Sequence, residues 1–259
     1  SLPICVAISD FNADGASDLY TPHFFAKDYD SENLLFMAQN GSFEELGADR
    51  GVNDPSYSYA SLAGDFDADG DKDIFVMNYH SSSYPNEPNH LYLNTGSGSF
   101  SNATGRLGSN SASDSKGATL TDIEKDGDLD IIVVNGSSPH QVYLNDGAAN
   151  FTVNTQILQS FRSSGKSYAS VTAGDMDNDG YQDLVICHNT GVDIARNTQN
   201  GGYSSMASLT LAAGVNSASL CDVDNDGDLD IIVGSDAGPY SRIEVFQNNN
   251  GSFVNISDS

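Results

Sequence analysis

The chain has 259 residues, and its 36 acidic and 10 basic side chains give a formal net charge of −26 at pH 7. This charge argues against nucleic acid as a partner, and no apolar run is long enough for insertion into a membrane. The cysteines are too few for a disulfide framework, and their apolar surroundings predict buried free thiols rather than a bridge: Cys5, Cys187 and Cys221.

The first predicted elements are a short strand and an acidic loop of nine residues, D-F-N-A-D-G-A-S-D, which begins at Asp10. Oxygen-bearing side chains stand at loop positions 1, 3, 5 and 9, and Gly15 at position 6 permits the sharp reversal that brings position 9 back toward the others. Alternate side chains of such a loop converge on one point, which is how a short loop wraps a hard cation. The loop therefore predicts a Ca²⁺ site.

The same loop recurs four times, beginning at Asp65, Asp122, Asp175 and Asp222. Five copies at spacings of 55, 57, 53 and 47 residues indicate a structural repeat, whereas a single copy could be a solvated turn. We expect about five Ca²⁺, one per repeat, bound by side chains at positions 1, 3, 5 and 9 and by the backbone carbonyl at position 7. The predicted ligands are Asp10, Asn12, Asp14, Ala16 and Asp18 in loop one; Asp65, Asp67, Asp69, Asp71 and Asp73 in loop two; Asp122, Glu124, Asp126, Asp128 and Asp130 in loop three; Asp175, Asp177, Asp179, Tyr181 and Asp183 in loop four; and Asp222, Asp224, Asp226, Asp228 and Asp230 in loop five.

Each loop is flanked by strand patterns in the same order. A short strand with small residues precedes the loop, and an apolar, β-rich run follows it at residues 74–77, 131–134, 184–187 and 231–233. After a variable polar connection comes an alternating strand, such as L-Y-L-N from Leu91, and a Gly/Asn turn that ends in an aromatic residue. These are hairpin signals, and a fourth strand then leads to the next loop. No segment shows a convincing helical period.

Four strands per repeat predict an all-β fold, a β-propeller of four-stranded antiparallel blades with five blades. One unit of about fifty residues cannot cover its own apolar face, so we expect a single propeller domain over residues 1–259. The approximate blades are residues 1–57, 58–113, 114–167, 168–215 and 216–259.

The motif D-x-D-x-D-G-x-x-D, the apolar strand after it and L-Y-L-N-x-G-x-G-x-F together resemble FG-GAP and VCBS repeats, and residues 64–100 are similar to the ASPIC-type variety. The resemblance implies a calcium-binding propeller like those of integrin α-subunits, fungal lectins, bacterial surface proteins and some polysaccharide lyases. It transfers the calcium loop residue by residue but no activity, since function sits in sites and not in the fold. Asn12 and Glu124 stand where the family prefers Asp, so we expect loops one and three to depart most from the pattern.

Antiparallel blades place the calcium loops and the Gly turns on one face and the remaining connections on the opposite face. Histidine, tyrosine and basic residues gather in those remaining connections: His80, Tyr84, His90, Arg106, His140, Arg162 and Tyr240. They predict a binding face for an extracellular glycan or protein ligand, although polar loops alone would give a similar composition.

The leading hypothesis is an extracellular or cell-surface binding and adhesion module that calcium stabilises, and a non-enzyme. One alternative is a catalytic propeller of the polysaccharide lyase or sugar dehydratase type, and another is a building block of a surface assembly that associates with identical chains. In a secreted protein, N-x-S/T sequons are candidate glycosylation sites: Asn40, Asn102, Asn135, Asn250 and Asn255.

Overall fold

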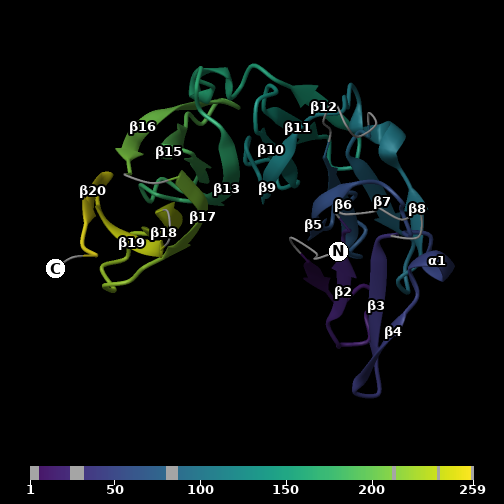
Figure 1. Ribbon diagram of the computed structural model, residues 1–259. Coiled ribbons are helices and arrows are strands. Elements are labelled where there is room, and N and C mark those ends of the chain that lie inside the picture. The colour runs from purple at the N-terminus through teal and green to yellow at the C-terminus, as the bar shows by residue number, and fades with distance from the viewer. Residues whose placement is uncertain (1–5, 24–31, 80–86, 212–213, 238–239, 258–259) are drawn as a thin grey trace. The chain divides into compact units, whose positions relative to one another are not determined.

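The computed structural model describes residues 6–23, 32–79, 87–211, 214–237 and 240–257. In these residues the chain forms five sheets, each of four antiparallel strands that follow one another in sequence (Figure 1). One repeat therefore makes one blade, and the predicted all-β propeller architecture of five four-stranded blades is confirmed.

The strands of the first two sheets are β1 (Ala7–Ser9), β2 (Asp18–Thr21), β3 (Leu34–Gln39) and β4 (Ser42–Glu45), then β5 (Ser58–Gly64), β6 (Asp73–Asn78), β7 (His90–Asn94) and β8 (Phe100–Asn102). The third sheet has β9 (Ser115–Thr121), β10 (Asp130–Asn135), β11 (Gln141–Asn145) and β12 (Phe151–Asn154). The last two have β13 (Tyr168–Gly174), β14 (Asp183–His188), β15 (Gly191–Asn197) and β16 (Tyr203–Thr210), then β17 (Gly214–Cys221), β18 (Asp230–Ala237), β19 (Tyr240–Asn249) and β20 (Ser252–Asn255). Helix is confined to α1 (Gly47–Arg50), η1 (Thr104–Leu107) and η2 (Gln159–Phe161) among the described residues.

The second strand of a blade is its most buried element. β6, β10 and β14 are buried at every residue, as expected for strands covered on both faces. Their runs of Ile, Val, Phe and Leu combine high β-propensity with a large apolar area, which explains why the apolar run after each loop becomes a strand.

The chain forms two compact units, each with its own core. The first unit comprises Ser1–Ser115 and Tyr143–Val153, and the second comprises Lys116–Val142 and Asn154–Ser259. Tyr20, Leu35 and Val76 belong to the core of the first unit. Met176 and Ile231 belong to the core of the second unit.

The cysteines are free thiols where the structure describes them. Cys187 is buried in β14, and Cys221 is half-buried at the end of β17. Cys5 lies outside the described residues.

Candidate metal centres

The five acidic loops share one backbone path. Position 6 is Gly in each loop and has a φ between 85° and 100°, which is the left-handed region that the reversal of the loop requires. The carboxylate at position 1 accepts the N–H of this glycine in every loop, at 2.8 to 3.1 Å. The loop is thus wound around its own first carboxylate.

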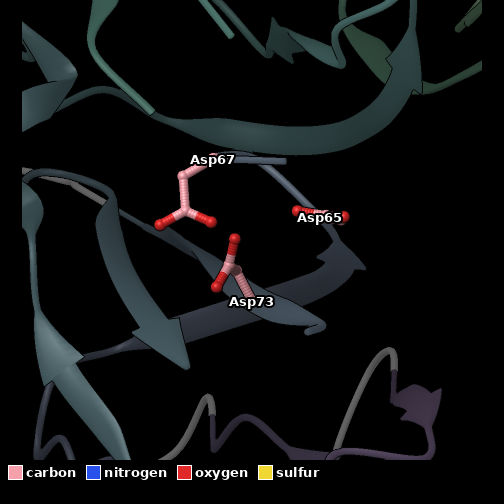
Figure 2. A group of neighbouring side chains, drawn as sticks. All are labelled: Asp65, Asp67 and Asp73. Carbon is pink, nitrogen blue, oxygen red and sulfur yellow. The ribbon is translucent and has the colours of Figure 1, made fainter. Parts of the chain in front are cut away.

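Three carboxylates converge in loop two. Asp65 and Asp67 come from the loop after β5, and Asp73 is the first residue of β6 (Figure 2). One oxygen of each lies within 4.8 Å of the other two. The same arrangement occurs at positions 1, 3 and 9 of loops four and five, namely Asp175, Asp177 and Asp183, and Asp222, Asp224 and Asp230.

These clusters fit a bound cation. Asp65 Oδ1, Asp67 Oδ1 and Asp177 Oδ1 are buried without a hydrogen-bond partner, so their lone pairs are open to a metal ion. Three carboxylates at this separation repel one another, and a divalent cation would replace the repulsion with attraction. Oxygen-only ligands are the set that Ca²⁺ prefers.

The position-9 carboxylates of loops two and four have raised pKa values. Burial raises the pKa of Asp73 to about 7, and the nearby charges of Asp67 and Asp69 add to the rise. Burial raises the pKa of Asp183 to about 6 in loop four, where Asp177 and Asp179 add to it. A proton therefore partly neutralises an empty loop near neutral pH, and a Ca²⁺ ion would compete for the same oxygens.

The raised pKa values predict an unusual pH dependence for the stability of the metal-free protein. Folded-state pKa values raised from 3.8 stabilise the fold below pH 4, and this stabilisation is lost as the pH rises through about 6 to 7. The melting midpoint in chelator should therefore be higher at pH 5 than at pH 8. The lowered pKa of His23 makes the fold more stable as the pH rises, which opposes this trend. It is one group, however, whereas the three carboxyls of Asp73, Asp128 and Asp183 act together.

Differential scanning calorimetry at the two pH values, with chelator and with saturating calcium, measures this effect. In saturating calcium the difference between the melting midpoints at pH 5 and pH 8 should disappear, because the ion displaces the protons. A chelated protein that is more stable at pH 8 would contradict the clustered geometry. Asp54 and Asp193 do not disturb the comparison, because their lowered pKa values act below pH 4.

The aspartate at position 9 has a second role that the sequence analysis missed. Asp73 is fully buried; its Oδ2 accepts the N–H of Phe66 and its Oδ1 that of Asn94, both at 2.8 Å. The position-2 N–H bonds to Oδ2 of position 9 in all five loops. This residue therefore fixes the loop to the strands of its blade, whether or not it also touches a metal ion.

Loops one, three and four differ from loop two in their side chains. Asn12 replaces a carboxylate in loop one, and its amide donates to Asp14 at 3.1 Å. Glu124 in loop three extends toward the turn at Gly201, where an added Cβ would lie 3.5 Å from its Oε1. In loop four, Arg196 Nε pairs with Asp177 Oδ2 at 2.8 Å, so a bound ion would share that carboxylate with a guanidinium.

An asparagine at the end of the third strand links neighbouring blades, and the sequence analysis did not predict it. Asn94 Nδ2 donates to the carbonyl of Phe11, which is position 2 of the preceding loop, at 2.8 Å. Equivalent bonds of 2.8 to 3.0 Å are made by Asn145 to Phe66, Asn197 to Ile123 and Asn248 to Met176. We call these four residues the asparagine clamp. It joins each of the first four acidic loops to the following blade.

The predicted ligand face is only partly supported by the positions of its residues. His140 is 2% exposed and its Nδ1 accepts the N–H of Asn135, so it is a structural residue and not a surface ligand. Arg106 donates to the Ala148 carbonyl, in the turn after β11, at 3.0 Å. Both assignments to the ligand face were wrong, because His140 is buried and the long side chain of Arg106 reaches a turn away from that face. Arg162 is exposed and donates to the Ser137 carbonyl in the connection after β10.

His90 belongs to a polar cluster at the start of β7. Its Nδ1 pairs with Asp54, and Tyr92 donates to the same carboxylate oxygen at 2.9 Å. Burial alone would raise the pKa of Asp54, but the bonds from His90 and Ser56 hold it below its usual value. His80 and Tyr84 lie outside the described residues, as does the side chain of Tyr240.

The asparagines of the predicted glycosylation sequons differ in their exposure to solvent. Asn40, Asn102, Asn250 and Asn255 are exposed. Asn135 is fully buried in β10 and its amide donates to the Pro139 carbonyl at 2.5 Å, so the prediction of a glycan there was wrong. Among the described residues, no helix has the length and apolar character needed to cross a membrane.

The chain matches known repeat families along most of its length. A model of the FG-GAP-like repeat matches residues 10–76, 65–133, 122–186 and 175–233, and a model of the FG-GAP repeat matches residues 214–254. Mouse cartilage acidic protein 1 is 26% identical over 193 residues, covering 71% of this chain and 29% of that protein. The human protein of the same name is 25% identical over 71% of this chain and 28% of its own length. The chain thus spans less than a third of these relatives.

Solved structures share the fold at low sequence identity. An Agrocybe aegerita lectin, described for its specific recognition of non-reducing terminal N-acetylglucosamine, is 16% identical with a TM-score of 0.61 over 96% of this chain and 64% of its own. The V. cholerae biofilm matrix protein Bap1 is 20% identical with a TM-score of 0.57 over 98% of this chain and 38% of its own. These likenesses show the fold alone.

Proposed function

Because this chain belongs to the FG-GAP-like repeat family, we propose that it is an extracellular binding module whose blades are stabilised by calcium. The observation that carries the proposal is the convergence of three carboxylates at positions 1, 3 and 9 of loops two, four and five. Calcium in the millimolar range is characteristic of extracellular modules, where such sites remain loaded at modest affinity. The likeness to cartilage acidic protein 1 and the acidic composition are consistent with that setting.

In this proposal calcium has a structural role. The ion would be held by the side chains at positions 1, 3, 5 and 9 of each loop, and loop one would contribute the neutral oxygen of Asn12. The bound loop would then be rigid, and the asparagine clamp would transmit that rigidity to the next blade, since each clamp amide bonds to a loop carbonyl. Calcium would thereby fix the spacing of blades whose connections present the ligand surface.

We propose glycans as the first ligand class to test. The lectin that shares the fold recognises non-reducing terminal N-acetylglucosamine, and a polar surface with arginine suits sugar hydroxyls and acidic sugars. Of the predicted ligand residues that the structure describes, Arg162 is exposed and His90 is partly buried, while Arg106 is exposed but bonds to a turn near the calcium loops.

A glycan array probed with and without calcium tests the proposal. We expect calcium-dependent retention, and Arg162→Ala should weaken it about tenfold or more while the melting midpoint stays within a few degrees, because an exposed charged contact adds little to folding. Arg106→Ala is the matched control, since it removes the same charge from an exposed side chain that bonds to a turn near the calcium loops. Equal loss in both variants, or retention that ignores calcium, would refute the assignment.

A further inference from the structure

Two side chains from outside loop four contact that loop, and both contacts recur in loop five. The first contact is made to the carboxylate at position 3 by the residue that precedes the asparagine of the clamp. Arg196 Nε lies 2.8 Å from Asp177 Oδ2 in loop four. In loop five, Gln247 Nε2 donates to Asp224 Oδ2. The same point of the repeat therefore carries a cation in the fourth blade and a neutral amide in the fifth.

The second contact runs from position 4 of one loop to position 7 of the next. Lys125 Nζ of loop three lies 4.6 Å from the ring centroid of Tyr181 in loop four, which is a cation–π contact. A Cβ added at Gly180 would lie 2.9 Å from the same Nζ. Asn178 Nδ2 of loop four donates to Asp228 Oδ1 in loop five at 2.8 Å. Again loop four receives a cation where loop five receives an amide.

Arg196 and the candidate metal centre share one carboxylate. Asp177 belongs to the cluster that it forms with Asp175 and Asp183. Its Oδ2 faces the guanidinium, whereas its Oδ1 is buried without a hydrogen-bond partner. The Asp177 side chain is 14% exposed and that of Arg196 is 48% exposed. The guanidinium thus neutralises part of the cluster from a position that water also reaches.

This arrangement lowers the attraction of loop four for a divalent ion. An ion bound by Asp177 would lie beside a guanidinium on the same carboxylate, and like charges at such a separation repel enough to weaken binding about tenfold even in water. Calcium affinity in a loop site depends on the count of ligand charges. Loop five has the larger count, with five aspartates at positions 1, 3, 5, 7 and 9, whereas loop four has Tyr181 at position 7.

We propose that Arg196 is a resident cation of loop four, which holds the calcium affinity of this loop below that of loop five. Loop four then fills only at calcium concentrations at which loop five is already saturated, and the fourth blade responds to calcium over a range in which the fifth does not. Lys125 acts in the same direction from the other side of the loop. The inference rests on the proposed function, because it takes calcium as the ion that the loops bind.

Exchanging the two side chains between the blades tests the proposal. The N–H groups of Gly180 and Gly227 donate to the position-1 carboxylates of their loops at 2.8 and 3.1 Å, so their NMR signals report the filling of loops four and five separately. In a calcium titration of the ¹⁵N-labelled protein, the Gly227 signal should move at lower calcium than that of Gly180. Arg196→Gln should lower the half-filling concentration of loop four about tenfold, and Gln247→Arg should raise that of loop five by a similar factor.

Two further variants separate the effect of charge from other causes. Arg196→Lys keeps the positive charge and should leave loop four the weaker site. Arg242→Gln removes the same charge from β19, at a residue that pairs with Ser235 near the end of β18 away from loop five, so neither half-filling concentration should change. Lys125→Gln gives an independent measurement on loop four, where it should lower the half-filling concentration as Arg196→Gln does. Melting curves in calcium first establish that each variant is folded.

The outcomes distinguish this inference from the proposed function. If loop five fills but Arg196→Gln leaves the half-filling concentration of loop four unchanged, the inference is overturned and the calcium-stabilised module remains. The same holds if Arg196→Lys tightens loop four as much as Arg196→Gln, or if loop four of the unaltered protein fills before loop five. If neither glycine signal moves at millimolar calcium, the inference and the proposed function both fail.

Discussion

Removal of calcium is expected to lower the melting midpoint of this protein by roughly 20 °C. A site that binds only the folded state contributes about 2.7 kcal/mol when free calcium is 100-fold above its dissociation constant. The three carboxylate clusters of loops two, four and five would together contribute about 8 kcal/mol. For a domain of this size, 1 kcal/mol shifts the midpoint by about 2 to 4 °C.

Calorimetric melts in calcium and in chelator measure the effect, and magnesium is the ionic control, because the smaller ion demands an octahedral geometry that a wrapped loop of carboxylates does not offer. A variant with Asp67→Asn, Asp177→Asn and Asp224→Asn removes the position-3 carboxylate from each cluster and should show a smaller difference in melting midpoint between the two buffers than the unaltered protein. An equal midpoint for the unaltered protein in calcium and chelator would remove the basis for a structural role of calcium.

The strands and loops were predictable from sequence because their causes are local. An apolar run such as residues 131–134 follows each loop, and β-branched residues in such a run favour an extended chain whatever surrounds them. The glycine at loop position 6 is required by the backbone itself, since its φ is positive in all five copies. Because these signals recur in the repeats, they could be distinguished from patterns that arise by chance.

The directions of long or buried side chains were not predictable in this way. His140 and Arg106 were assigned to one surface because both lie in connections that share a face of the blades. His140 instead fills a tight turn, where its ring accepts a backbone N–H and packs edge-on against Tyr168 at 4.5 Å. Arg106 reaches the turn after β11. The position of a residue in the sequence shows which end of a strand it lies near. It does not show how the side chain packs, and packing determines the direction of the side chain.

The asparagine clamp shows a signal that was visible but incompletely interpreted. Asn94, Asn145, Asn197 and Asn248 recur at the end of the third strand, whereas Ala38 stands there in the first repeat. The sequence analysis treated this asparagine as part of a hairpin turn, which is half of its role, since its Oδ1 accepts a turn N–H in the second, fourth and fifth blades. The other half depends on which blade lies next to it, which a single repeat cannot show.

The largest effect expected from a single substitution is at Asp73. At pH 8, above its raised pKa, the Asp73 carboxylate accepts backbone N–H groups of Phe66 and Asn94 on its two oxygens. Asp73→Asn replaces one acceptor with an amide donor that faces a backbone donor, and leaves that N–H buried without a partner. Such a group costs about 1 to 3 kcal/mol, and relief of the burial penalty on the Asp73 charge offsets part of that cost, so we expect a fall in the midpoint of about 2 to 10 °C.

Asp67→Asn is the matched control, because it changes the same functional group in the same cluster without removing an acceptor of two backbone amides. Burial and the charge of Asp69 raise the pKa of Asp67, so its ionised form is unfavourable in an empty loop. Asp67→Asn should therefore leave the midpoint in chelator unchanged or higher and lower it only in calcium. Asp73→Asn should lower it in both buffers, because the strands lose their attachment to the loop even when no ion is present. A midpoint for Asp73→Asn that falls only in calcium would make position 9 a metal ligand alone, and the two backbone bonds at 2.8 Å would then contribute nothing measurable to the stability of the blade.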